Sequence, residues 1–136
     1  MKRMTILAAF ILAATHAARP VEARDDKAPE VKEIMKKMGA PTGLYSNVAK
    51  ELKEADPMWE EVQQQTKDIS KLLATLGKAT PPKGDKESWA KLTKAFADNG
   101  KALEKAASKM DLKVARDVSK KMENSCKGCH SAHRLD

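Results

Sequence analysis

The sequence predicts an all-α protein, an antiparallel four-helix bundle, and three observations lead to this fold class. Apolar residues recur at steps of three and four along four successive arms, which is the spacing of an amphipathic helix. Short segments, most of them containing Pro or Gly, separate these arms. No stretch alternates apolar and polar residues as a half-buried strand does. Because the connections are short, consecutive helices are expected to run up and down.

The first arm is predicted to begin at Pro29, a residue suited to the first turn of a helix. The segment Gly39–Gly43 contains two glycines and a proline, so it should kink or break the arm in its middle. The expected inward face on the two sides of this break consists of Val31, Ile34, Met35, Met38, Leu44, Tyr45, Val48 and Leu52.

The second helix is predicted to have Asp56 as its N-cap and Pro57 in its first turn, and to end at Gly77. Its buried stripe is expected to be Trp59, Val62, Thr66, Ile69, Leu73 and Leu76.

The third helix is predicted to start after Asp85, and a turn around Asp111 separates it from the fourth. The expected inward residues of the third are Trp89, Leu92, Phe96, Leu103, Ala106 and Met110. Those of the fourth are Leu112, Ala115, Val118 and Met122.

The N-terminus has the pattern of a secretory signal peptide. Two basic residues precede an apolar run over 4–14, which is short for a bilayer span, and small residues follow. We expect cleavage after Ala23, with Ala18 as the alternative site and an uncleaved membrane anchor as the competing interpretation. Residues 1–23 are then the signal peptide and 24–136 form one domain. That domain is expected to be periplasmic or otherwise exported and soluble, without stable membrane insertion.

The motif Cys126-Lys127-Gly128-Cys129-His130 lies close to the C-terminus. Its spacing is the pattern of covalent haem c attachment, in which each thiol bonds to one vinyl group of the porphyrin. The histidine that follows becomes an axial ligand of the iron. Since Cys126 and Cys129 are the only cysteines, the motif predicts one haem per chain.

Three other interpretations compete for the same residues. A thioredoxin-like CxxC should accompany a βαβ pattern, which is absent here. A zinc site would recruit Cys126, Cys129, His130 and His133, although structural zinc usually takes its ligands as two separated pairs. A Cys126–Cys129 disulfide is compatible with an exported protein but leaves His130 without a role.

The stretch 126–134, on the last predicted helix, resembles the terminal motif of the class II cytochromes c, the family of cytochrome c′ and its low-spin relatives. This resemblance implies a four-helix bundle with haem held near the C-terminal helix. In that family a basic residue four positions after the ligand histidine lies near the haem, and Arg134 matches it. His133 stands where the family usually has an aromatic residue.

The resemblance also implies two functions that differ in the sixth iron ligand. Members with a methionine ligand from the first helix are low-spin electron carriers, whereas members without one bind nitric oxide or carbon monoxide at an open iron. Met35 is the favoured ligand, because Met35–Gly39 resembles the segment of the low-spin members, and Met38 is the alternative. Both methionines could instead be ordinary core residues.

We therefore expect an exported monohaem cytochrome that carries single electrons and is not an enzyme. The alternatives are a five-coordinate gas-binding protein and a non-haem module. Without residues 1–23 the formal net charge falls from +7 to +5, which would steer the protein toward acidic redox partners. No nucleic-acid partner is expected, because the few aromatic residues are not interleaved with basic ones. The oligomeric state stays open between a monomer and a homodimer.

Overall fold

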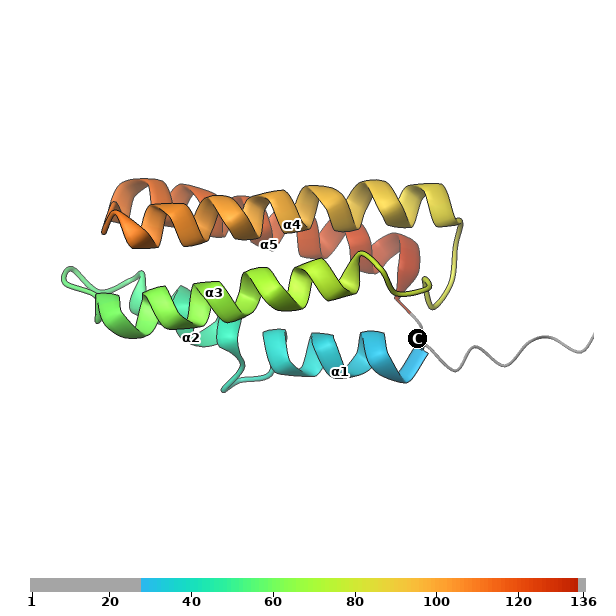
Figure 1. Cartoon of the computed structure of the whole chain (residues 1–136), viewed down its shortest axis with the longest axis horizontal. Helices are drawn as coiled ribbons and strands as arrows, with labels where there is room; N and C mark the ends of the chain where they lie inside the picture. The colour runs from blue at the N-terminus through green and yellow to red at the C-terminus, as the bar shows by residue number, and fades with distance from the viewer. Residues whose placement is uncertain (1–27, 135–136) are drawn as a thin grey trace, which may run out of the picture.

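The computed structural model describes residues 28–134, which form five α-helices and no strand (Figure 1). The predicted signal peptide, residues 1–23, lies outside the described residues. Within 28–134 no helix has both the length and the apolar character needed to cross a membrane. The helices are α1 (Ala28–Gly39), α2 (Leu44–Glu51), α3 (Trp59–Leu76), α4 (Lys86–Ser108) and α5 (Leu112–His133).

The described chain is a bundle of four helical arms, because α1 and α2 are two halves of one arm broken at 40–43. This confirms the predicted helical bundle and the predicted break. In Figure 1, α1 runs along the end of the bundle where α4 begins and α5 ends, and α2 runs along the other end.

Most residues of the predicted inward stripes belong to one hydrophobic core. Each fully buried leucine or isoleucine contributes about 1.5–3 kcal/mol through removal of its apolar surface from water. Several predicted inward residues are partly buried and pack at the edge of this core, among them Leu44, Tyr45, Trp59 and Leu112, and Leu92 is also only partly buried. The largest fully buried side chains are Val48, Val62, Thr66, Ile69, Leu73, Leu76, Thr93, Leu103 and Met122.

Aspartates cap the starts of α4 and α5: α4 begins directly after Asp85, as predicted, and α5 begins directly after Asp111, where the sequence predicts a turn. The Asp85 carboxylate accepts a 2.8 Å hydrogen bond from the Ser88 N–H at the start of α4. The Asp111 carboxylate accepts a 3.0 Å hydrogen bond from the Val114 N–H at the start of α5. Each bond satisfies an N–H group that has no partner within its own helix.

The predicted start of the second helix is wrong. Helix α3 begins at Trp59 with Met58 in the N-cap position, and Asp56 does not cap it. The Met58 N–H instead donates a 3.2 Å hydrogen bond to the Glu51 carboxylate. The partner thus comes from the end of the preceding helix, so a local N-cap pattern cannot reveal it.

The prediction that Met110 faces the core is also wrong. Helix α4 ends at Ser108, and the turn that follows carries Met110 at a φ of 52°. Its side chain is 58% exposed, whereas the period of the third predicted helix placed it in the core. The helical spacing fails here because the backbone has already left the helix.

The bundle has three closely packed sides and one looser side. Within 28–134 the α1–α2 arm packs on α3, α3 packs on α4 and α4 packs on α5. Between α5 and the α1–α2 arm there is no extensive close approach of the backbones. This fourth side is the part of the fold that matters for the candidate site.

Candidate functional site on helix α5

The cysteines of the CxxCH motif lie on the inward face of α5. Cys126 and Cys129 are half-buried and pack against the hydrophobic core, and both thiols are free. Met122, Cys126, Cys129 and His133 follow one another at steps of four, three and four, the spacing of a single helical stripe. Met122 is completely buried. The two thiols therefore face the interior of the bundle from adjacent positions.

His130 lies at the edge of this stripe. It comes four residues after Cys126, which turns it about 40° around the helix from that cysteine. Its side chain is exposed, and within residues 28–134 it makes no hydrogen bond or ion pair. Its ring nitrogens are therefore free to bind an external group.

The environment of the thiols does not favour thiol–disulfide chemistry. Burial raises the pKa of Cys126, and the neighbouring Cys129 raises it further; burial also raises the pKa of Cys129. Both residues lie in the last third of α5, far from the helix N-terminus that lowers thiol pKa values in redox CxxC motifs. The observed position thus separates this CxxC from a thioredoxin-like one.

His133 lies on the same stripe as the cysteines, but its ring nitrogens bind other groups. Its Nδ1 lies 2.7 Å from the Lys83 carbonyl oxygen, and its Nε2 lies 3.1 Å from the Ser88 hydroxyl. No cluster of three or more potential metal-binding side chains occurs in the described part of the chain. The four-ligand zinc arrangement considered from the sequence is therefore not assembled. Sequence reasoning left the packing role of His133 open, because its partners come from 50 and 45 residues earlier.

The two methionines of α1 have different surroundings. Met38 is 4% exposed and belongs to the buried core. Met35 is half-buried and packs at the edge of that core. Helix α1 occupies the same end of the bundle as the C-terminal half of α5 (Figure 1). Met35 is thus the less buried of the two methionines, and its helix lies at the end of the bundle that holds the cysteines.

An open groove of about 670 Å³ lies on the fourth side of the bundle. It is formed between α2 and the N-terminal half of α5. Tyr45 and Ser119 face it from the two helices, and Arg116 also lines it. The looser side of the bundle is therefore hollowed at its surface.

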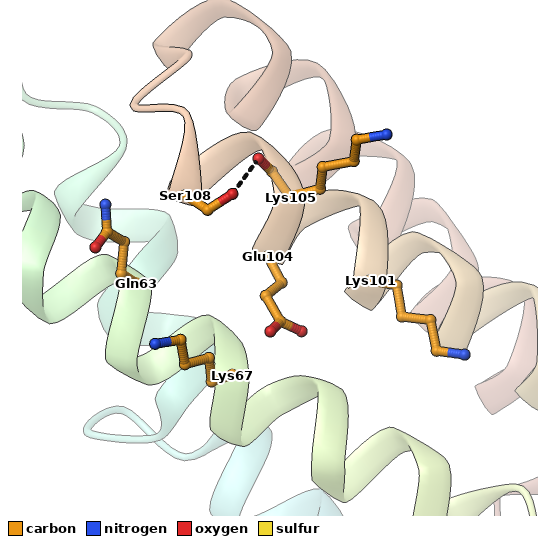
Figure 2. A pocket seen from close by; sticks show the side chains of 6 residues that line it. All are labelled: Gln63, Lys67, Lys101, Glu104, Lys105 and Ser108. Atoms are coloured by element: carbon orange, nitrogen blue, oxygen red, sulfur yellow. Dashed lines mark hydrogen bonds between the residues drawn. The ribbon is translucent and has the colours of Figure 1, made fainter.

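A second hollow, of about 290 Å³, lies between α3 and α4 (Figure 2). Glu104 points into it in Figure 2. It belongs to helices that do not carry the motif, and its charged lining does not suit a large apolar group such as a porphyrin. Its lining residues are Gln63, Lys67, Lys101, Glu104, Lys105 and Ser108.

Comparison of the chain with models of protein families, with curated proteins and with solved structures gave no match.

Proposed function

We propose that this protein is an exported c-type cytochrome that carries single electrons through one covalently attached haem. One observation supports this most directly: Cys126 and Cys129 lie one turn apart on the inward face of α5, with the unengaged His130 beside them. A porphyrin with two vinyl groups needs two thiols on one segment and an imidazole on the same side. The donor set fits that group.

Each residue has a distinct task in this proposal. Cys126 and Cys129 would hold the porphyrin by two thioether bonds and so prevent its dissociation. His130 would bind the iron through its imidazole, and Met35 would provide a further ligand, with Met38 as the alternative. Bound haem supplies reversible one-electron transfer at its iron. The apolar stripes of the surrounding helices limit the access of water.

The looser fourth side of the bundle supports a place for the porphyrin. Direct packing of α5 onto the α1–α2 arm would leave no space for a flat group between them. The half-buried thiols and the half-buried Met35 lie toward the same end of the bundle. We therefore propose that the porphyrin lies between α1 and the C-terminal half of α5.

The surface charge supports an acidic redox partner. Exposed lysines occur on both helices that border the proposed haem position. Complementary charge accelerates encounter between proteins, and the acceleration falls as salt screens it. These lysines are Lys32, Lys36, Lys37, Lys120 and Lys121. Lys127 is also exposed there, but it forms an ion pair with Glu123 at 2.9 Å.

The test is covalent haem attachment. The full chain is expressed in cells competent in cytochrome c maturation and run on a denaturing gel that is stained for haem peroxidase activity. The wild-type band should stain, and the Cys126→Ala/Cys129→Ala variant should not. Ser131→Ala, a change at an exposed neighbour in the same helix, is the matched control and should stain like wild type. A colourless wild-type band would contradict the proposal.

A further inference from the structure

The imidazole of His133 is enclosed in a socket of polar and aromatic groups. The residue is only 2% exposed. The Lys83 carbonyl can only accept, so the ring donates through Nδ1–H at 2.7 Å. In the neutral ring, Nε2 then accepts from the Ser88 hydroxyl at 3.1 Å. Both nitrogens of a buried side chain are therefore satisfied.

The walls of this socket come from the α3–α4 loop and the start of α4. The Trp89 ring meets the imidazole edge-on, with centroids 5.3 Å apart, and its indole N–H donates to the Ala79 carbonyl at 2.8 Å. Gly84 has a φ of 81°, and a Cβ there would lie 2.8 Å from His133 Nδ1. Only glycine suits both the backbone conformation and the close approach. The loop is therefore shaped to this ring.

His133 is rigidly related to His130. It lies three residues later in the same helix, about 60° around the axis and about 4.5 Å along it. The Arg134 N–H donates to the His130 carbonyl at 3.1 Å, which closes the last turn around both residues. Any rotation of this turn about the helix axis would move both imidazoles together.

We propose that His133 is a positioning residue that sets the direction of the His130 imidazole toward the haem iron. The inference rests on the proposed function, in which His130 is an axial ligand. Apolar packing along α5 is non-directional, whereas hydrogen bonds fix an orientation. The Asn99–Ser125 hydrogen bond is another directional link between α4 and α5, but it lies about two turns before His133. His133 thus holds the turn that carries the ligand.

The test uses the haem-bearing protein and a measurement that responds to ligand orientation. His133→Phe keeps a ring against Trp89 and removes both hydrogen bonds. The population of misdirected last turns should rise roughly thirtyfold, the factor that two net hydrogen bonds represent. Electron paramagnetic resonance of the ferric protein should then show a second species. Ser88→Ala, which leaves α5 unaltered, should shift the spectrum in the same direction by less.

A matched control separates orientation from stability. Arg116→Gln removes guanidinium hydrogen bonds to the α2 end, including one of 2.6 Å to the Leu52 carbonyl, about 21 Å along α5 from His130. It should lower the melting temperature without changing the ferric spectrum. A haem-bearing His133→Phe protein with a single wild-type species would overturn the inference alone. If that variant does not fold, an unchanged Ser88→Ala spectrum overturns it. A wild type without haem overturns the proposed function, and this inference falls with it.

Discussion

The hydroxyl of Tyr45 on α2 donates a 2.7 Å hydrogen bond to the main-chain carbonyl of Ser119 on α5, 74 residues later in the chain. The same hydroxyl lies 3.2 Å from the Ser119 hydroxyl. Arg116 makes a similar link, because its guanidinium donates to the carbonyls of Leu52, Lys53 and Glu54. The fourth side of the bundle is thus bridged by polar groups at the α2 end. This leaves the α1 end, where the cysteines lie, without such bridges among the described residues.

The Tyr45 hydroxyl should ionise at a higher pH than that of an ordinary tyrosine, because its pKa is raised. Burial is the largest cause that raises its pKa above the usual value of 10.0, and nearby Cys126 and Glu123 raise it further. The hydrogen bond to the Ser119 side-chain hydroxyl lowers the pKa of Tyr45 but does not reverse the shift. Since Tyr45 is the only tyrosine in the chain, the absorbance of tyrosinate reports it directly. The titration midpoint of the folded apoprotein should lie above that of the unfolded chain.

The same shift predicts a loss of stability in alkali. A raised pKa in the folded state means that the folded protein holds this proton more tightly than the unfolded chain does. The stabilisation is complete below pH 10.0 and is lost as the pH rises through the folded-state pKa. Melting temperatures measured across this range should fall less for Tyr45→Phe than for wild type. Equal falls in the two proteins would show that another group is responsible.

The helix caps give a prediction with an internal control. Asp85→Ala and Asp111→Ala should each lower the free energy of unfolding by about 1 kcal/mol, because each removes the acceptor of a terminal N–H. Asp56→Ala should have little effect, since Asp56 is exposed and does not cap α3. Urea titrations of the three variants check this. A cost at Asp56 equal to that at Asp85 would contradict the observed start of α3.

Asp85 caps a helix where the sequence predicts a helix start, whereas Asp56 does not cap α3, and this difference illustrates which parts of the fold can be predicted from the sequence. Hydrophobic spacing identifies each helix because one face of each must be buried, and that requirement acts along the local sequence. At the start of α3 the Met58 N–H finds its partner in the Glu51 carboxylate of the preceding helix, and the Nδ1 of His133 finds its partner in a loop 50 residues earlier. Such tertiary partners leave no local pattern.

The candidate site, too, has features that the sequence predicts and features that only the folded structure provides. The spacing of Cys126, Cys129 and His130 is the one that covalent haem attachment would require, so the sequence alone is enough to suggest this site. The spacing alone places both Met35 and Met38 on the apolar face of α1, and the sequence favours Met35 only through the resemblance of the segment Met35–Gly39. The packed structure adds the difference in burial between the two methionines, which depends on the helices opposite. The looser side of the bundle is likewise a property of the assembled fold.

The close approach of Gly100 on α4 to Leu73 on α3 predicts that Gly100→Ala destabilises the wild-type protein but stabilises a Leu73→Val variant. A Cβ at Gly100 would lie 2.7 Å from Cδ1 of Leu73, whose side chain is fully buried. Gly100→Ala should destabilise the protein, because crowding a packed core costs about 1–3 kcal/mol, and this outweighs the gain of roughly 1 kcal/mol in helix propensity. In a Leu73→Val background the Cδ1 atom is gone, so the same change should stabilise by about 1 kcal/mol. Chemical denaturation of the four proteins measures the coupling.

The sixth ligand decides between an electron carrier and a gas-binding protein, and the two methionines of α1 allow a matched comparison. If the Met35 thioether binds the iron, wild type should be low-spin, and carbon monoxide should bind slowly because it must displace the ligand. Met35→Ala should then give a high-spin visible spectrum and rapid carbon monoxide binding. Met38→Ala should keep the wild-type spectrum and lose about 2–5 kcal/mol of stability, since Met38 is 4% exposed. The reverse pattern would assign the ligand to Met38. A wild type that is already high-spin, and whose carbon monoxide binding neither substitution changes, would establish the gas-binding alternative.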